Sequence, residues 1–229
     1  MQDVAIQSVD RILRTLSGAV RAARPNPGDL RPAATVVDQA DSVGSGGANG
    51  DLGDPAVSMT DAERLRSIAL MRVNHAGEVA AQALYQGQAL FSRDPKVRAK
   101  LEHAANEELD HLAWTRERVH ELGGRTSVLD PLWYAGAFTL GAAAAAVGDK
   151  SSLAFLEATE EQVEAHLDSH LSELPANDAK SRAIVKQMKA DEASHAQTAR
   201  ELGSPGMPRP VQGLMRAASK VMTSLAAKI

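Results

Sequence analysis

The chain has 229 residues, a formal net charge of −4 and no cysteine, and aromatic residues make up 3% of it. Its 25 basic and 29 acidic residues leave no electrostatic footprint for nucleic acid, and the lack of cysteine excludes disulfides, thiolate metal sites and cysteine nucleophiles. Any metal must be held by histidine and carboxylate, which favours iron or manganese over structural zinc, and the alanine-rich, aromatic-poor composition favours helices.

Two segments precede the main part of the chain. Residues 1–22 carry apolar side chains at helical spacing, which predicts a short amphipathic helix. This segment lacks the compact apolar run of a secretory signal, so we do not expect secretion, but its arginines leave a transit peptide open. Residues 23–58 are rich in Pro, Gly and Ala and offer too little apolar surface to order themselves, which predicts a flexible linker.

The remaining segment, residues 59–229, is predicted to be one folded domain that contains only helix signals. Thr60 and Glu63 have the spacing of a capping box, and Gly123 and Gly203 stand where helices should end. The third helix is apolar, but it is mostly Ala and Gly and too short for the roughly 20 residues of a membrane span. We therefore predict an all-α fold with helices over residues 61–91, 95–122, 131–147, 151–174, 178–202 and from 210 onward.

Two of the predicted helices share a short motif. The second contains Glu108 and His111, and the fifth contains Glu192 and His195. Residues three apart lie on one face of a helix, so the two members of a pair can contact one metal ion. Both pairs lie on apolar stripes, where a carboxylate and an imidazole are costly to bury unless they are paired or bound to metal. Either motif alone also occurs by chance on solvated helices.

The motif belongs to a longer repeat. Glu78 precedes Glu108 by 30 residues, and Glu160 precedes Glu192 by 32. One helix that supplies a Glu, followed by one that supplies Glu-x-x-His, is the ligand arrangement of ferritin-like di-metal carboxylate proteins. We therefore predict a ferritin-like four-helix bundle, with two additional helices, that binds two metal ions through four carboxylates and two imidazoles. The alternative is a coincidence of charged patches on solvated helix faces.

Other polar residues near these motifs have less specific interpretations. Asp110 is a candidate to accept a hydrogen bond from the His111 imidazole. Asp191 is interpreted as a solvated or helix-pairing residue. His75 either supports the ligands or is a satisfied buried histidine, and Tyr85 is interpreted as part of the core.

At residues 70–81 the run Leu-Met-Arg-Val-Asn-His-Ala-Gly-Glu-Val-Ala-Ala resembles the first ligand helix of the demethoxyubiquinone hydroxylases. These are ferritin-like monooxygenases of ubiquinone biosynthesis. The segments Glu107-Glu108-Leu-Asp-His111, Glu160-Glu161 and Asp191-Glu192-Ala-Ser-His195 follow the order and spacing of that family. The resemblance extends from about residue 60 to the C-terminus.

The resemblance implies a role for each ligand. Glu108 and Glu192 would bridge two iron ions, and the remaining ligands would complete one iron each, Glu78 with His111 and Glu160 with His195. His166 matches a family position linked to activity near the quinone, which makes it a candidate catalytic residue. Leu167 follows it where the family often has an aromatic residue, and His170, one turn further on, is interpreted as an ordinary buried histidine.

The implied reaction is the O2-dependent hydroxylation of the ring of a 2-polyprenyl-3-methyl-6-methoxy-1,4-benzoquinone or its quinol. Two iron ions per chain would be the cofactor and O2 the co-substrate. Two metal ions about 3.5–4 Å apart are a recurring catalytic arrangement. No GxGxxG fingerprint occurs in the sequence, so we do not expect a bound flavin or nicotinamide.

The expected partners are the polyprenylated quinone, a membrane surface and other proteins of ubiquinone biosynthesis. The C-terminal helix combines an apolar face with basic residues, and no acidic residue follows Glu201. This pattern is typical of a helix that lies on anionic lipid, and Trp133 and Tyr134 suit the lipid–water interface. We expect peripheral attachment to the cytoplasmic face of a bacterial inner membrane, or to the matrix side of the mitochondrial inner membrane.

Two other functions remain open at this point. One is a ferritin-like ferroxidase or iron-handling protein, and the other is a helical membrane-associated protein without enzymatic activity. Iron content distinguishes the second of these from the first, and formation of an oxygenated quinone distinguishes a hydroxylase from both.

Overall fold

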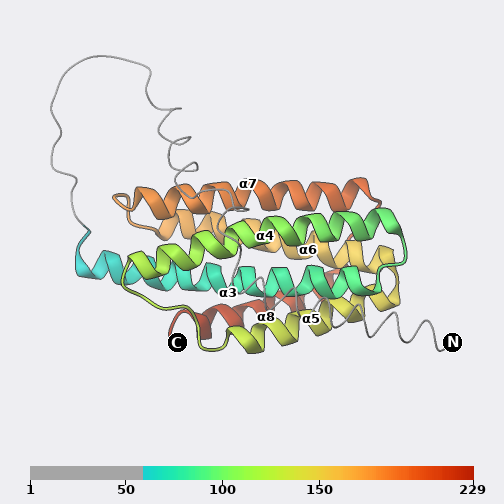
Figure 1. Cartoon of the computed structure of the whole chain (residues 1–229), viewed down its shortest axis with the longest axis horizontal. Helices are drawn as coiled ribbons and strands as arrows, with labels where there is room; N and C mark the ends of the chain where they lie inside the picture. Colours follow the sequence, from blue (N-terminus) through green and yellow to red (C-terminus); the bar gives the residue numbers. More distant parts are fainter. Residues whose placement is uncertain (1–58) are drawn as a thin grey trace, which may run out of the picture.

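The computed structural model describes residues 59–229, and this part of the chain is entirely helical, without strands (Figure 1). The helices are α3 (Asp61–Phe91), α4 (Pro95–Glu121), α5 (Asp130–Val147), α6 (Asp149–Glu173), α7 (Ala179–Glu201) and α8 (Arg209–Ala226). The predicted all-α fold is confirmed, and the ends of the predicted helices shift by at most two residues. The predicted helix over residues 1–22 and the linker over 23–58 lie outside the described residues. The domain boundary at residue 59 therefore stays a prediction.

Local chemistry sets where the helices begin. Thr60 accepts a hydrogen bond from the backbone N–H of Glu63, and the Glu63 carboxylate accepts one from the backbone N–H of Thr60, so the predicted capping box is present. The side chain of Asp178 caps α7 in the same manner by accepting from the backbone of Ser181 at 3.0 Å. Arg118 of α4 donates to the same Asp178 oxygen at 2.7 Å, which ties the start of α7 to the end of α4.

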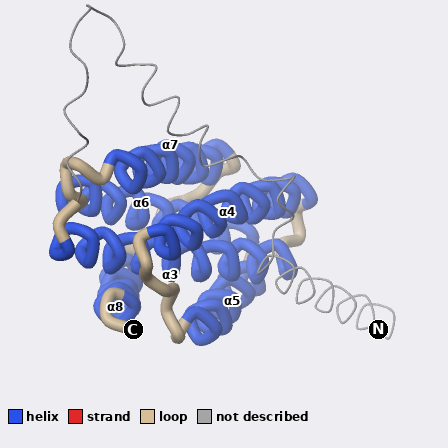
Figure 2. The backbone as a smooth tube through the Cα atoms, turned by 60° about the vertical axis from the view of Figure 1, so that its left-hand side comes forward, coloured by secondary structure: helices blue, strands red, loops and turns tan. Residues whose placement is uncertain are grey.

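Four of the helices form the bundle and two cover one side of it. The hairpin of α3 and α4 packs against the hairpin of α6 and α7, as Figures 1 and 2 show. Helix α5 lies along α3 and also touches α6, and α8 packs against the same two helices. Because α5 and α8 share the α3–α6 side, the opposite side of the bundle is formed by α4 and α7 alone.

The apolar core is divided into two clusters along the bundle. One contains Tyr85, Leu101, Leu153 and Ala199, and the other contains Met71, Trp114, Leu167 and Met188. Each of the four helices contributes residues to both clusters, and the predicted ligands of each helix lie in sequence between those residues. The centre of the bundle therefore lies between two blocks of packed apolar side chains.

Two glycines let α5 approach α3 closely. A Cβ atom on Gly87 would lie 2.3 Å from the carbonyl oxygen of Phe138, and one on Gly141 would lie 2.3 Å from the carbonyl oxygen of Leu84. Both obstacles are backbone atoms of the facing helix, which cannot move aside as a side chain can. The separation of α3 and α5 thus depends on the absence of side chains at these positions.

We predict that Gly141→Ala destabilises the protein because the added methyl group pushes α5 away from α3. The expected loss is about 2–3 kcal/mol in the free energy of unfolding, measured by urea denaturation followed by circular dichroism. Gly136→Ala on the same helix is the matched control, since a Cβ there meets no atom within 4 Å. That substitution should be neutral or stabilising by up to about 1 kcal/mol, because alanine is the better helix former. Equal effects of the two substitutions would contradict the close contact.

Candidate metal centre

The four bundle helices bring all six predicted ligands to the centre of the bundle. Possible ligand atoms of Glu78, Glu108, His111 and Glu192 lie within 4.8 Å of one another, and those of Glu160, Glu192 and His195 form a second such group. All six side chains are buried, and none is more than 7% exposed. The two groups share Glu192, so they form one continuous cluster.

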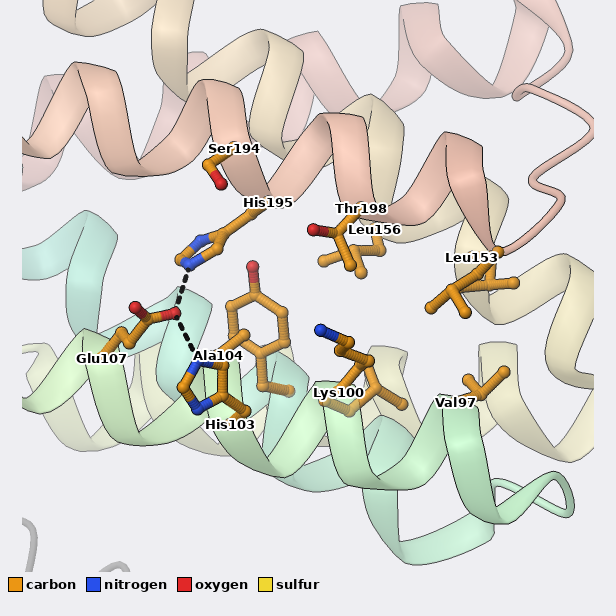
Figure 3. Close-up of a pocket in the computed structure, with 13 residues that line it drawn as sticks. Val97, Lys100, His103, Ala104, Glu107, Leu153, Leu156, Ser194, His195 and Thr198 are labelled. Carbon is orange, nitrogen blue, oxygen red and sulfur yellow. Dashed lines mark hydrogen bonds and ion pairs between the residues drawn. The ribbon is translucent and has the colours of Figure 1, made fainter.

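The second group lies between α6 and α7. His195 Nδ1 is 3.2 Å from Glu192 Oε2 and 3.5 Å from Glu108 Oε1. The other ring nitrogen, Nε2, points away from the cluster and lies 3.1 Å from Glu107 Oε2, an interaction visible in Figure 3. The His195 ring thus presents Nδ1 to the carboxylates and is held from behind through Nε2.

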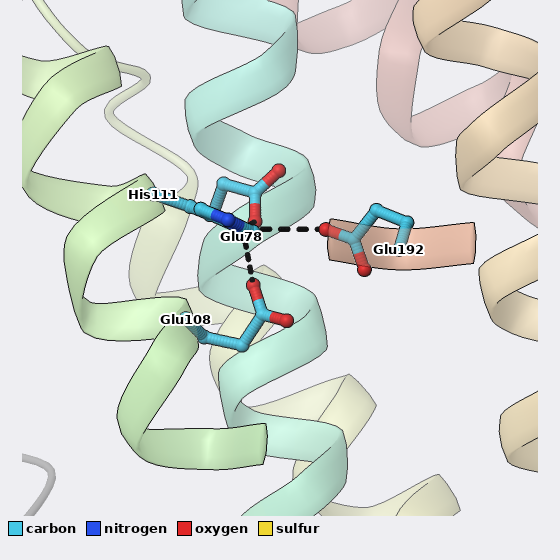
Figure 4. Close-up of side chains that lie close together, drawn as sticks. All are labelled: Glu78, Glu108, His111 and Glu192. Carbon is cyan, nitrogen blue, oxygen red and sulfur yellow. Dashed lines mark hydrogen bonds and ion pairs between the residues drawn. The ribbon is translucent and has the colours of Figure 1, made fainter. Parts of the chain in front are cut away.

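The first group has the same arrangement around His111. Figure 4 shows the side chains of Glu78, Glu108 and Glu192 converging on this ring. Its Nδ1 atom lies 3.4 Å from Glu78 Oε2, 3.2 Å from Glu108 Oε2 and 3.3 Å from Glu192 Oε1. Its Nε2 atom lies 3.0 Å from Asp191 Oδ2. Both imidazoles therefore direct Nδ1 toward the centre of the bundle.

Two of the glutamates contact both histidines. Glu108 presents Oε2 to His111 and Oε1 to His195, and Glu192 presents Oε1 to His111 and Oε2 to His195. Among the ion pairs of the cluster, Glu78 reaches only His111. A carboxylate that offers one oxygen to each side of a cluster has the geometry needed to link two ions.

The residues that hold the two imidazoles from behind were missed or misinterpreted in the sequence. Asp110 was a candidate acceptor for His111, but the carboxylate at its Nε2 atom is that of Asp191, which we interpreted as a solvated or helix-pairing residue. Glu107 holds His195 in the same way. Each acceptor directly precedes the Glu of a Glu-x-x-His motif and serves the histidine of the other motif. A carboxylate in this place fixes the orientation of a metal-binding imidazole and raises its basicity.

The hydrogen bonds of the cluster do not use all of its carboxylate oxygens, so some oxygens are left to bind metal. One buried oxygen of each glutamate accepts no well-formed hydrogen bond from a described residue: Glu78 Oε2, Glu108 Oε1, Glu160 Oε2 and Glu192 Oε1. Those of Glu78, Glu108 and Glu192 have a histidine Nδ1 atom at 3.4, 3.5 and 3.3 Å, but each Nδ1 can donate only one hydrogen bond. Buried carboxylate oxygens without partners are costly, and cations are the partners that would satisfy them. Carboxylate and imidazole suit iron and manganese among the common metals, and four carboxylates neutralise two divalent ions. The residues present therefore fit a pair of metal ions.

The electrostatics of the site without metal agree with this fit. Burial, together with the charge of Glu108, raises the pKa of Glu78 well above its usual value, and burial next to Glu192 does the same for Glu160. Burial by itself lowers the pKa of His195, but hydrogen bonds to Glu107 and Glu192 outweigh it and raise the pKa to about 11. The folded chain thus retains protons in the cluster, and metal ions would displace them.

His166, the candidate catalytic residue, is not part of this cluster. It is half-buried on α6, and its ring centroid lies 3.9 Å from that of His170. His170 is buried and its Nδ1 atom is 2.7 Å from the side-chain oxygen of Asn74 on α3. The interpretation of His170 as a satisfied buried histidine agrees with this contact.

Two further residues that sequence reasoning left open have defined contacts. His75 is fully buried, and its Nδ1 atom lies 3.0 Å from the hydroxyl of Thr115, which donates to the backbone carbonyl of His111 at 2.7 Å. It therefore supports the helix that carries a ligand and not the ligand ring itself. Tyr85 packs in the core as expected, but its hydroxyl also donates to Glu160 at 2.6 Å.

A cavity of about 170 Å³ lies between α4 and α7 and reaches the cluster at His195 (Figure 3). Tyr85, Leu101 and Leu156 are among its inner walls, and Lys100, His103, Glu107, Ser194 and Thr198 are among the polar residues that line it. The cavity is on the side of the bundle that α5 and α8 leave uncovered.

The fold and the site together define a ferritin-like helical bundle with a buried carboxylate–histidine cluster suited to metal. A family model described as "Ubiquinone biosynthesis protein COQ7" matches residues 66–226. The chain therefore belongs to the COQ7 family, as the sequence resemblance implied.

Named relatives agree with the family model. A 3-demethoxyubiquinol 3-hydroxylase of Ralstonia pickettii (strain 12J) is 51% identical over 229 residues, which cover all of both chains. A protein of the same name from Chromobacterium violaceum is 54% identical over 223 residues, 97% of each chain. A third, from Variovorax paradoxus (strain S110), is 60% identical over 171 residues, 75% of this chain and 82% of that protein.

We predict that Glu160→Gln stabilises the metal-free protein, because an amide avoids the cost of burying an ionised carboxylate. With a chelator present, the melting temperature should rise by roughly 3–10 °C, equivalent to about 1–3 kcal/mol. A carboxyl group whose pKa is raised on folding favours the folded state below its unfolded pKa and destabilises it as the pH rises. The difference between variant and wild type should therefore be small at pH 5 and large at pH 8.

Addition of a divalent metal should reverse the order, raising the melting temperature of the wild type by more than that of Glu160→Gln. Glu164→Gln, one turn further along α6, is the matched control and should behave as the wild type. A metal-free Glu160→Gln protein that is less stable than the wild type at pH 8 would contradict this account of the cluster.

Proposed function

We propose that this protein is a di-iron monooxygenase that hydroxylates the ring of a 2-polyprenyl-3-methyl-6-methoxy-1,4-benzoquinone, or its quinol, in ubiquinone biosynthesis. The observation that carries the proposal is the buried cluster of four glutamates and two histidines, in which one oxygen of each glutamate accepts no well-formed hydrogen bond from a described residue. The names of the relatives, 3-demethoxyubiquinol 3-hydroxylases, support the substrate and the reaction.

In this proposal each ligand has a distinct role that follows from its contacts. Glu108 and Glu192 would contact both iron ions, because each presents one oxygen to each histidine. Glu78 and His111 would complete the ligands of one iron, and Glu160 and His195 those of the other. When bound, the two ferrous ions supply the binding and reduction of O2 that the hydroxylation requires.

The protein's own residues provide a fixed, dry site for this chemistry. Asp191 and Glu107 hold the imidazoles with Nδ1 toward the metal positions. The two apolar clusters on either side of the ligands, with Met71 and Trp114 at most 1% exposed, exclude water along the bundle axis. Exclusion of water strengthens the electrostatic interactions in the site and suppresses side reactions. His166 stays a candidate catalytic residue that no observed contact connects to the cluster.

We also propose that the side of the bundle covered by α5 and α8 is the side that meets a membrane. Both helices expose large apolar residues to solvent: Leu132, Leu140, Val147, Val211, Leu214, Val221, Leu225 and, just beyond α8, Ile229. None of the described helices combines the length and the apolar character that crossing a membrane requires. An exposed apolar face on a basic helix suits attachment to the surface of an anionic bilayer, where a prenylated quinone is dissolved.

A membrane on the α5–α8 side would give the quinone ring a short path from lipid to the metal cluster. The substrate's long isoprenoid tail favours lipid, whereas its ring must reach ligands at the centre of the bundle. Helices α5 and α8 pack directly on α3 and α6, which supply Glu78 and Glu160. A bilayer at this side, on the cytoplasmic face of a bacterial inner membrane, would deliver the ring from the side opposite to the α4–α7 cavity. Other ubiquinone-biosynthesis proteins are candidate partners at the same membrane.

We predict that the anaerobically reconstituted Fe(II) protein transfers one atom of 18O2 to the quinone ring in a single turnover. The two ferrous ions supply the two electrons that reduce the second oxygen atom to water. Mass spectrometry of the product should show one added 18O atom per ring. Glu192→Ala should bind little iron and form no product, because it loses the carboxylate that contacts both histidines.

The matched control for that experiment is Glu201→Gln, an exposed position at the end of the same helix, which should retain wild-type turnover. Full iron occupancy and activity in Glu192→Ala would contradict the ligand set. Rapid oxidation of Fe(II) in the wild type without any oxygenated quinone would contradict the hydroxylase and indicate the ferroxidase alternative.

We predict that the wild-type chain floats with liposomes that contain anionic lipid and that Leu214→Glu weakens this binding about tenfold or more. Leu214 is 71% exposed in the absence of lipid, and burial of a leucine side chain in lipid contributes about 1.5–3 kcal/mol. Ser224→Glu adds the same charge to α8 at an exposed position that is not one of its apolar residues. This substitution should reduce liposome binding less than Leu214→Glu does. Equal loss of binding in the two variants would indicate a purely electrostatic attraction and contradict the apolar docking face.

A further inference from the structure

Tyr85 is the one aromatic side chain of α3 whose contacts join the metal cluster to the surrounding core. It lies two turns beyond Glu78 on the same helix and is fully buried. Its hydroxyl donates to Glu160 Oε1 at 2.6 Å. Its ring meets the imidazole of His195 edge-on, with centroids 5.9 Å apart and planes at 81°. Tyr85 therefore contacts two of the proposed ligands of the same iron, and both of them come from other helices.

This contact makes the two oxygens of Glu160 different. Oε1 accepts from Tyr85, whereas Oε2 is buried and has no hydrogen-bond partner among the described residues. A phenol carries one proton on its oxygen at neutral pH and a carboxylate oxygen can only accept, so the Tyr85 hydroxyl is the donor in this contact. This hydrogen bond is shielded from competing water, and it would be strengthened further when metal binding leaves the Glu160 carboxylate ionised.

We propose that Tyr85 is a positioning residue that makes Glu160 a one-oxygen ligand. The Oε1 atom of Glu160 accepts the hydrogen bond from the phenol, and the Oε2 atom is left to bind metal. The inference rests on the proposed metal centre and concerns only one of its two positions, that of Glu160 and His195. A carboxylate that binds through one oxygen leaves a coordination position free on its metal. The hydrogen bond from Tyr85 prevents Glu160 from turning its second oxygen into that position.

Satisfaction of a buried phenol is the simpler explanation of the contact, since a buried tyrosine hydroxyl usually finds some partner. The surroundings favour a role in positioning. Tyr85 also lines the cavity between α4 and α7, as does His195, whose ring it meets edge-on. The ring therefore stands between this cavity and Glu160, and its hydroxyl is directed to the ligand and not to the polar residues of the cavity.

The test is a titration of the metal-free protein with Co(II), which reports affinity and, through its visible absorption bands, the coordination of each ion. The wild type should bind two Co(II) ions. Tyr85→Phe removes one oxygen atom and keeps the packing. It should lower the affinity for one of the two Co(II) ions by about 10–100-fold and leave the affinity for the other unchanged. The absorption bands of the weakened ion should also change, because Glu160 gains freedom to bind through both oxygens.

A double-variant experiment identifies the affected position. His195→Ala removes a ligand of the metal position formed with Glu160. In this background, Tyr85→Phe should have little further effect on the affinity for the remaining Co(II) ion. In a His111→Ala background, Tyr85→Phe should still lower the affinity for the remaining Co(II) ion. Tyr134→Phe is the matched control, because that phenol bonds to Gln86 on the outer side of α3 and touches no ligand.

Two results would overturn the inference, and they are distinguishable. Two Co(II) ions bound by Tyr85→Phe with wild-type affinity and wild-type spectra would remove the role of Tyr85 and leave the metal centre intact. Failure of the wild type itself to bind Co(II) would overturn the proposed metal centre and this inference with it. Thermal melts of the metal-free variants, followed by circular dichroism, should show that Tyr85→Phe and Tyr134→Phe are both folded.

Discussion

The mutual repulsion of four buried carboxylates is the constraint on which the rest of this structure depends. Glu78, Glu108, Glu160 and Glu192 converge in the buried centre of the bundle, together with the imidazoles of His111 and His195. Such a cluster is stable only if cations or protons compensate the charge. The raised pKa values of Glu78 and Glu160 show this strain in the chain without metal. A core arranged in this way sacrifices stability to create a site for metal.

Residues around the centre help to compensate the charge of the carboxylates. The two histidines face the carboxylates through Nδ1 and are held through Nε2 by Asp191 and Glu107, which lie partly in solvent. Each of these acids belongs to the helix opposite to the histidine that it holds. The two Glu-x-x-His helices, α4 and α7, are therefore connected by a reciprocal pair of contacts. This pair ties together two helices that otherwise leave a cavity between them.

The two sides of the bundle differ in their packing and in the residues that they expose. On one side, α5 is set tightly against α3 through Gly87 and Gly141, and with α8 it presents apolar side chains outward. On the other side, the cavity between α4 and α7 is lined partly by polar residues and ends at Tyr85 and His195. In our proposal, the apolar side meets the membrane that holds the substrate, and the metal centre lies between that side and the cavity.

The sequence alone determined the helices of the described region, their ends and the six residues of the cluster, because capping and i, i+3 spacing act within a few residues. It also supplied the family resemblance, through the run over residues 70–81 that contains Glu78. Only the tertiary structure decided that His111 meets Asp191, that His195 meets Glu107, and that Tyr85 meets Glu160. These partners lie 80, 88 and 75 residues apart. Their pairing depends on the rotation and register of packed helices, which no local pattern encodes.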